Sequence, residues 1–315
     1  MEDDIYLDCK EQSDNYDKVT PFWNSLALKY GYDDAERLRS AFRLERRNRG
    51  DDLEKPSNPE NFNVVIFDIE TLPLKSYTWG VWKQNISPVQ LIDDWVMLSW
   101  ASKDLMRGEI RSQIMTPKEA LARDDKRISE GLWTEFDRAN ILIGHNATDF
   151  DVPKAKTRFL FHGMLPPSPF RIIDTLKIAK YNFRFTYNKL GYLNDYLGIT
   201  RKLDNEGFAL WQKCANGDPE ALATMLEYNE GDIGSSEELY LALRAWDDRH
   251  PQIGLYFDDV ETRCRNCGST NLKNLDKPYT TNLGVYQSVR CNNCGAIGRR
   301  PTNKLSKEKR MALLR

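Results

Sequence analysis

The sequence has few histidines, no long apolar run and almost no net charge, and each of these shortages excludes a class of protein. Only three histidines occur in 315 residues, at positions 145, 162 and 250, which leaves little material for histidine-based catalysis. No apolar segment approaches the ~20 residues that cross a bilayer, so we expect no membrane span and no membrane partner. The net charge of −2 argues against a histone-like binder that depends on bulk positive charge.

The N-terminal segment MEDDIYLDCK is acidic and lacks the basic start and apolar stretch of a secretory signal. We therefore expect a cytoplasmic protein, in which the six cysteines are metal ligands or buried thiols rather than disulfides. Charge is unevenly placed, because arginines crowd residues 37–49 and basic residues recur at 299–315. This distribution suits basic arms around an acidic centre that requires cations.

Changes in composition predict the domain organisation. Proline, asparagine and acids with little apolar content mark a linker, and the pattern changes again where His250-Pro251 ends the last predicted helix. We predict a helical, helix-turn-helix-like module at 1–50, a linker at 51–61, a main domain at 62–250, a cysteine-bearing module at 258–301 and a basic tail at 302–315.

Hydrophobic patterns in the main domain predict strands separated by helices. The first three strands are predicted to form an antiparallel meander, and helices alternate with strands after them. The predicted strands are 64–70, 96–102, 109–115, 141–145 and 171–174, and the predicted helices lie near 117–138, 151–163, 187–197 and 217–246. This order indicates an α/β fold, with a mixed sheet flanked by helices.

Two carboxylates stand at the end of the first predicted strand, VVIFDIE. Because side chains alternate along a strand, Asp68 and Glu70 point to the same side. Adjacent carboxylates repel each other, and a divalent cation between them removes that conflict. The alternative is a strand end that simply reaches solvent.

Three further residues complete the candidate site. Asp151, in GHNATDFDVP, opens a helix at the edge where the strands end, although it could be only a helix cap and Asp149 could be the ligand instead. We favour Asp151 because its phase fits Phe150 as an inward anchor. Tyr228 and Asp232 are four apart in a predicted helix and so share one face, which could also be an ordinary helix surface.

The motifs FDIET, Asn-x4-Asp in HNATDFD, and Tyr-x3-Asp, in this order, resemble the three exonuclease motifs of the DEDD (DnaQ-like) superfamily. The resemblance covers roughly residues 62–248, and the segment beginning RIIDTLKIAKYNF is similar to the stretch after the second motif in that group. It implies a ribonuclease H-like fold and 3′–5′ exonuclease activity. Tyr228 indicates the DEDDy subgroup, since Glu227 stands where the other branch has histidine.

The resemblance also implies a two-metal mechanism for phosphodiester hydrolysis. Asp68 would bridge two Mg²⁺ or Mn²⁺ ions, with Glu70 and Asp232 as further ligands of one ion and Asp151 as the ligand of the other. Tyr228 would orient the attacking water.

Two CxxC pairs, each followed by glycine, resemble the knuckles of a zinc ribbon. Cys264, Cys267, Cys291 and Cys294 can place four thiolates around one structural Zn²⁺. Arg290, Arg299 and Arg300 favour nucleic acid over protein as the partner of this module.

Other residues are weaker candidates for nucleic-acid contacts. The predicted second N-terminal helix carries arginines on one face, which is typical of a helix-turn-helix but also of a solvated charged helix. The candidate contacts are Arg39, Arg43, Arg46, Arg47, Asn146, Asn188, Lys189 and Lys202. Tyr77, Trp79 and Trp82 could stack on bases, but we expect them to pack beneath a loop.

Three functions therefore compete. The favoured one is a metal-dependent 3′–5′ exonuclease, acting on DNA rather than RNA. The second keeps the chemistry but is a ribonuclease or a structure-specific endonuclease. The third is a nucleic-acid-binding regulator with an inactive nuclease core, against which the intact set of five site residues argues.

Overall fold

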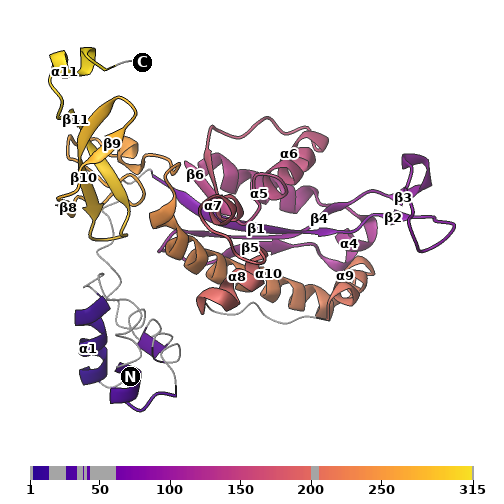
Figure 1. The fold of residues 1–315 in the computed structure, drawn as a ribbon. Coiled ribbons are helices and arrows are strands. Elements are labelled where there is room, and N and C mark those ends of the chain that lie inside the picture. Colours follow the sequence, from indigo (N-terminus) through magenta and orange to yellow (C-terminus); the bar gives the residue numbers. More distant parts are fainter. Residues whose placement is uncertain are drawn as a thin grey trace. The chain divides into compact units, whose positions relative to one another are not determined.

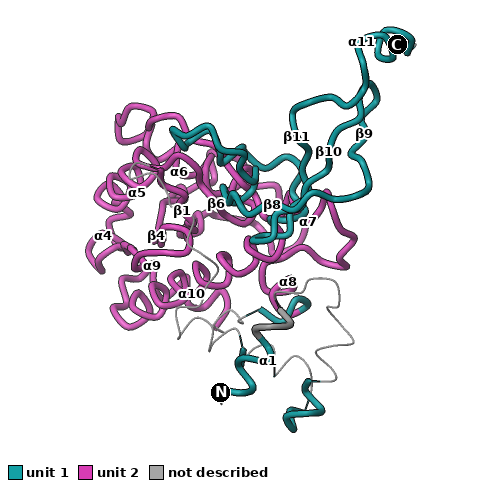
Figure 2. The backbone as a smooth tube through the Cα atoms, turned by 90° about the vertical axis from the view of Figure 1, so that its left-hand side faces the viewer, with its two compact units in different colours: residues 1–60, 196–199, 244–315 teal, residues 61–195, 200–243 magenta. Residues whose placement is uncertain are grey.

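The computed structural model describes residues 3–13, 26–33, 38, 41–42, 62–199 and 206–313. The chain forms two compact units (Figure 2). One unit consists of Asn61–Asp195 and Thr200–Leu243, and the other of Met1–Glu60, Tyr196–Ile199 and Arg244–Arg315.

The first of these units is built on a five-stranded mixed sheet with the strand order β5-β4-β1-β6-β7 (Figure 1). Its strands are β1 (Val64–Leu72), β4 (Val96–Asp104), β5 (Arg111–Ile114), β6 (Ile141–Gly144) and β7 (Arg171–Asp174). β1, β4 and β5 pair antiparallel, whereas β6 and β7 continue the sheet in parallel from β1. The predicted α/β fold class and the antiparallel meander are confirmed.

Helices cover both faces of this sheet, with α5 and α6 over one face and α9 and α10 over the other (Figure 1). The helices are α4 (Pro117–Ala122), α5 (Lys126–Arg138), α6 (Asp151–Phe161), α7 (Thr175–Asn182), α8 (Leu190–Leu197), α9 (Phe208–Ala215) and α10 (Pro219–Leu243). On the α5 side, Phe67 of β1 packs edge-on against Phe136 at 4.9 Å between ring centroids, and Phe136 packs against Phe159 of α6 at 5.6 Å. Strand alternation then directs the neighbours of Phe67, including Asp68, to the α10 side.

Helix boundaries differ from the sequence predictions in two places. The predicted helix at 117–138 is two helices, because Arg123 ends α4 in the left-handed conformation with φ 53° and its N–H bonds back into the helix. The eight-residue helices α7 and α9 lie outside the predicted helix ranges.

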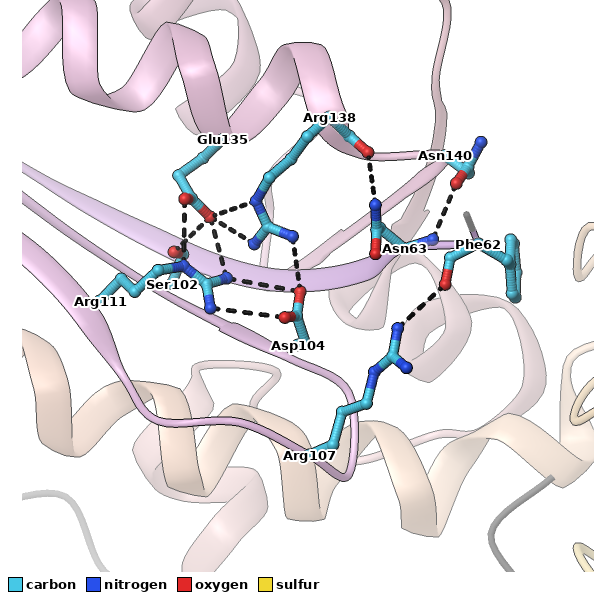
Figure 3. A network of polar contacts seen from close by, with 9 residues as sticks. All are labelled: Phe62, Asn63, Ser102, Asp104, Arg107, Arg111, Glu135, Arg138 and Asn140. Atoms are coloured by element: carbon cyan, nitrogen blue, oxygen red, sulfur yellow. Dashed lines mark hydrogen bonds and ion pairs between the residues drawn. The ribbon is translucent and has the colours of Figure 1, made fainter. Parts of the chain in front are cut away.

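A polar network surrounds the amino end of β1 (Figure 3). Glu135 and Asp104 bind the guanidinium of Arg138 at 2.6 and 2.8 Å, and Glu135 also binds Arg111 at 3.0 Å. Asn63, just before β1, donates its amide to the backbone oxygen of Arg138 at 3.1 Å. The network joins α5, β4 and β5 at the end of the sheet away from the acids of β1.

A second charged cluster surrounds the fully buried carboxylate of Asp125. Asp125 accepts two hydrogen bonds of 2.6 Å from the guanidinium of Arg158, one of 2.6 Å from His162 and one of 2.8 Å from the backbone N–H of Met97. Its side chain is 0% exposed. The cluster fastens the start of α5 to β4 and α6.

The other unit contains a small antiparallel sheet in which β10 pairs with β8, β9 and β11. Its elements are β8 (Leu272–Asn274), β9 (Tyr279–Thr281), β10 (Gly284–Cys291), β11 (Ile297–Asn303), α11 (Lys307–Met311) and the short 3₁₀ helices Arg244–Trp246 and Ile253–Tyr256. Near the N-terminus, α1 (Asp3–Ser13) carries Tyr6 and Cys9, which are buried with Leu26, Leu38 and Phe42. The predicted contacts Arg39, Arg43, Arg46, Arg47 and Lys202 lie outside the described residues.

Between β1 and β4 the chain forms a long hairpin built on the short strands β2 (Lys75–Ser76) and β3 (Leu91–Asp93), with a 3₁₀ turn at Pro88–Gln90. Figure 1 shows it projecting from the sheet. Across the ranges that the structure describes, no helix combines the length and the apolar character needed to cross a membrane.

Candidate functional site

The site begins with two carboxylates on β1, a strand whose apolar residues Val64 to Phe67 are all buried. Asp68 lies opposite Ala101 of β4 and Glu70 opposite Ser99. The register shifts immediately after Glu70, so the ladder carries a β-bulge at the acidic end of the strand. Bulges re-aim side chains in this way beside functional sites.

The helix α10 supplies the third carboxylate, because it packs across β1 and β4. Asp232 is 2% exposed and Tyr228, one turn earlier, is 8% exposed. The ring of Tyr228 packs edge-on against Trp211 of α9, with 6.1 Å between the ring centroids.

One carboxylate oxygen from each of Asp68, Glu70 and Asp232 lies within 4.8 Å of the other two. Three negative groups so close together, one of them buried, repel each other unless a cation compensates them. An all-oxygen, all-anionic donor set suits a hard divalent ion such as Mg²⁺ or Mn²⁺. The residues present therefore fit such a metal site.

Asn229 is a member of the site that the sequence analysis missed. Its side-chain amide donates a 2.7 Å hydrogen bond to Asp68 Oδ2, and its amide oxygen accepts one of 3.0 Å from the Ser99 hydroxyl. Asn229 and Ser99 are both 0% exposed. This buried relay orients Asp68 from behind.

Asp151 lies beside the cluster rather than within its 4.8 Å set. It is the first residue of α6, is 3% exposed, and accepts a 3.3 Å hydrogen bond from the backbone N–H of Ile69, the residue between Asp68 and Glu70. Burial, with a smaller contribution from the charge of Asp174, raises the pKa of Asp151 to about 7. A bound cation would act in the opposite direction, since it favours the charged carboxylate.

Asp174 holds the loop that delivers Asp151. It caps α7 by accepting a hydrogen bond from the backbone N–H of Leu176. It also accepts 3.0 Å bonds from the backbone N–H groups of Asn146 and Thr148. Asn146 adopts a left-handed φ of 65°, which turns the chain between β6 and α6.

One expectation about the loop between β6 and α6 was wrong. Phe150 is not an inward anchor, because 39% of it is exposed. The alternative ligand Asp149 pairs with Lys177 at 3.1 Å on the surface, with 65% of its side chain exposed. Asp151, by contrast, is buried. His145 has both ring nitrogens engaged, one with Thr175 Oγ1 and one with the Asn188 carbonyl, each at 2.9 Å, so it joins β6 to the start of α7 and to the segment before α8.

The four paired cysteines form a separate cluster in the other unit. Their sulfur atoms lie within 4.8 Å of one another, with 3.5 Å between Cys264 and Cys294 and 3.6 Å between Cys267 and Cys291. A tetrahedral Zn²⁺ with Zn–S bonds of ~2.3 Å separates its sulfurs by ~3.8 Å, so the spacing fits. None of the six cysteines, all of which are described, forms a disulfide.

The two cysteine pairs have matching backbones. The N–H groups of Gly268 and Gly295 each donate a 2.9 Å bond to the carbonyl of the first cysteine of their pair, and both glycines have left-handed φ values, 74° and 81°. A side chain at either position would be strained. These repeated turns point all four thiols into one site.

A comparison with protein-family models assigns the region that contains the five-stranded sheet and its acids to a superfamily. Residues 65–244, more than half of the chain, match the RNase_H_2 family model, described as RNase_H superfamily. The chain belongs to the RNase_H superfamily. All four acids lie inside the matched range, and the four-cysteine cluster of this superfamily member lies outside it.

Comparisons with individual proteins add less. No curated protein matches this RNase_H superfamily chain. Among solved structures it is similar to the family B DNA polymerase from the hyperthermophilic archaeon Pyrobaculum calidifontis, with 18% sequence identity and a TM-score of 0.43. The match covers 59% of this chain and 26% of the polymerase chain, so the chain corresponds to about a quarter of that protein.

Of the weaker candidates in this superfamily member, Asn146 and Asn188 flank the acids through the loops around His145. The Asn146 backbone bonds to Asp174 and the Asn188 carbonyl bonds to His145, which are structural contacts. The Asn188 amide oxygen is buried without a hydrogen-bond partner, and Lys189 is exposed. Their contacts with nucleic acid remain predictions.

Proposed function

We propose that this protein is a metal-dependent 3′–5′ exonuclease that hydrolyses phosphodiester bonds of DNA. The observation that carries the proposal is the convergence of Asp68, Glu70 and Asp232 within 4.8 Å, with Asp151 hydrogen-bonded to the strand that bears two of them. Membership of the RNase_H superfamily and the order of the three motifs support a nuclease of the DEDDy subgroup.

Each carboxylate has its own task in this proposal. Asp68, held at one oxygen by Asn229, would contribute to holding both ions, Glu70 and Asp232 would help to hold one, and Asp151 would help to hold the other. Two bound Mg²⁺ or Mn²⁺ ions would stabilise the charge on the attacking and leaving oxygens.

Tyr228 is proposed to orient the attacking water through its hydroxyl. Its ring is fixed by Trp211 and by the apolar core around it, so the hydroxyl has a defined position on the face of α10 that carries Asp232. A hydroxyl held in this way contributes orientation rather than proton abstraction.

The four-cysteine cluster is proposed to hold one structural Zn²⁺. Its sheet would then be a zinc ribbon at 258–301. In sequence order, the proposed parts of the chain are a helical module at 1–50, an exonuclease domain at 62–250, this ribbon and a basic tail at 302–315. Arg299 lies over the ring of Tyr286 at 3.9 Å on this ribbon, where its charge is available to a phosphate backbone.

Digestion of matched, end-labelled oligonucleotides tests the proposal. With Mg²⁺ or Mn²⁺, a 5′-labelled single strand of DNA should give a ladder that shortens with time, and a 3′-labelled strand should release labelled mononucleotide at once. Chelation should stop both. Matched RNA should be cut more slowly, and a circular single strand should resist. Cleavage of the circle would instead favour the endonuclease alternative.

Binding of the cations can be measured without turnover. Electron paramagnetic resonance of Mn²⁺ should show specific binding to the wild-type protein that weakens in Asp68→Asn. If cleavage and Mn²⁺ binding are both absent in the wild-type protein, the nucleic-acid-binding regulator becomes the better description.

A further inference from the structure

The hairpin between β1 and β4 carries aromatic side chains that the fold does not bury. We refer to residues 73–95 as the aromatic hairpin. The exposed fractions of Tyr77, Trp79 and Trp82 are 76%, 99% and 84%. The expectation that these rings pack beneath a loop was therefore wrong. Large rings grouped on a surface are typical of a binding site rather than of ordinary surface composition.

The backbone that presents these rings is ordered by its own hydrogen bonds. The Tyr77 N–H donates to the Gln90 carbonyl at 3.0 Å, and the Gln90 side chain donates to the Tyr77 carbonyl at 3.1 Å and accepts from Ser87 at 2.9 Å. Nearer the tip, Gln84 donates to the Trp82 carbonyl at 2.7 Å. These hydrogen bonds shape the loop without burying its aromatic rings, which therefore remain exposed for contact with a ligand.

The base of the aromatic hairpin is clamped to the domain. The Arg123 guanidinium donates to the Pro73 carbonyl at 2.8 Å and to the Asp94 carbonyl at 2.7 Å, so one side chain holds both ends of the hairpin. Burial lowers the pKa of Arg123, and the nearby Asp93 and Asp94 oppose that effect. The clamp gives the hairpin a fixed root beside β1 and β4.

The hairpin is also continuous with the acid site. β1 passes from Glu70 into its first arm, and its second arm passes into β4, where Ser99 bonds to Asn229. At its root, Lys154 Nζ lies 3.7 Å from the ring centroid of Trp95 and 5.4 Å from that of Phe150, the residue before Asp151. The root of the hairpin thus carries aromatic and cationic groups, one of which, Phe150, directly precedes Asp151 in the sequence.

The charge of the aromatic hairpin selects the class of partner. Its charged residues are Lys75 and Lys83 together with Asp93 and Asp94, and Lys75 pairs with Asp93 at 3.3 Å near the root. Lys83 therefore gives the tip a positive charge, and the segment from Leu74 to Ile92 contains no acid. Aromatic rings interleaved with polar and basic residues suit a single-stranded polyanion with stackable bases. Contact with an apolar protein groove or a lipid surface does not depend on planar rings separated by polar residues, because aliphatic side chains serve equally well there.

We propose that the aromatic hairpin is a stacking platform for the single-stranded DNA that leads to the acid site. This inference rests on the proposed function and names the part of the substrate that the hairpin binds. Tyr77 follows Glu70 by seven positions, a reach of at most ~25 Å. That reach corresponds to roughly seven nucleotides stacked at ~3.4 Å each. Nucleotides nearer the 3′ end occupy the acid site, and those further upstream lie on the rings.

Binding and cleavage of long and short oligothymidylates test this platform. Fluorescence anisotropy with a chelator present measures the affinity for strands of about 15 and about four nucleotides. Trp79→Ala with Trp82→Ala should raise Kd for the long strand by about tenfold or more and leave the short strand unchanged. Val89→Ala, at a position that is 90% exposed on the same hairpin, is the matched control and should change neither.

Conservative variants separate stacking from general apolar contact. Phenylalanine at both positions should keep most of the affinity, whereas leucine at both should lose as much as alanine. Equal retention by leucine would overturn the stacking platform and indicate a protein or lipid surface. Unchanged long-strand affinity in the alanine variant would also overturn it. In either case, continued Mg²⁺-dependent cleavage of the short strand by the variants would leave the proposed function intact. If the wild-type protein did not cleave the short strand, the proposed function itself would be contradicted.

Discussion

Asn229 donates its side-chain amide to Asp68 at 2.7 Å and so holds the carboxylate at the centre of the site from the buried side. Its amide oxygen accepts a hydrogen bond from the Ser99 hydroxyl at 3.0 Å. Because a carboxylate can only accept, these two contacts together fix which side of the amide faces Asp68. Asp68 is thereby fixed by two residues that do not themselves reach the cation site.

Replacing Asn229 should therefore weaken catalysis without removing a ligand. Asn229→Ala is expected to lower kcat and the affinity for Mn²⁺ by about 10- to 100-fold, as loss of a residue that orients a metal ligand generally does. Steady-state digestion and Mn²⁺ titration measure the two effects.

The control for this variant is Ser99→Ala, which keeps the Asn229–Asp68 bond and should have a smaller effect on both quantities. A kcat that is unchanged in Asn229→Ala, with the fold intact by circular dichroism, would show that Asp68 needs no such support.

Removing the Tyr228 hydroxyl should slow the reaction but not abolish it. In Tyr228→Phe the orientation of water is lost while all four carboxylates and the packing on Trp211 remain. Single-turnover digestion should show a reduced rate with Mn²⁺ affinity unchanged. Complete inactivity in a folded Tyr228→Phe protein would assign the hydroxyl a larger part than orientation.

The buried cluster around Asp125 predicts a large effect on stability. Asp125→Asn leaves the Arg158 guanidinium, 7% exposed, without its countercharge, so the free energy of unfolding should fall by about 3–5 kcal/mol. Chemical denaturation followed by tryptophan fluorescence measures the change.

Asp149→Asn is the matched exposed case, because the Asp149–Lys177 pair lies on the surface. Its effect should be no more than about 1 kcal/mol. Equal losses in the two variants would mean that burial of the Asp125 cluster contributes nothing.

The two kinds of metal should be independently removable. Thiolates hold zinc far more tightly than carboxylates hold magnesium, so the dialysed protein should retain about one Zn²⁺ while still requiring added Mg²⁺ or Mn²⁺. Cys264→Ser with Cys267→Ser should release the zinc and leave cleavage of short oligonucleotides in place. Elemental analysis that finds no zinc in the unmodified protein would remove the zinc ribbon from the proposal.

Local patterns in the sequence were enough to predict the mixed sheet, because β-branched runs and helical spacing are properties of neighbouring residues. Alternation along β1 likewise predicts that Asp68 and Glu70 share a face, and their carboxylates do lie together. The one-turn spacing of Tyr228 and Asp232 follows from helix geometry in the same way.

Relationships between distant segments were not predictable from such patterns. Asn229 and Ser99 are 130 positions apart, and the antiparallel pairing that sets Ser99 opposite Glu70 brings the serine beneath α10. The exposure of Trp79 and Trp82 was predicted wrongly, because aromatic content alone does not show whether a loop folds over its own rings. Here glutamine side chains close the loop instead.

Hydrolysis by Asp232→Asn and Glu227→Gln, compared side by side, tests the central claim most directly. Both residues belong to α10, but Asp232 is buried in the acid cluster and Glu227 is exposed. With Mg²⁺ and a 3′-labelled DNA strand, Asp232→Asn should release no labelled nucleotide while still binding the strand, and Glu227→Gln should match the wild-type rate. Normal turnover by a folded Asp232→Asn protein would contradict the assignment of this carboxylate cluster as the catalytic metal site.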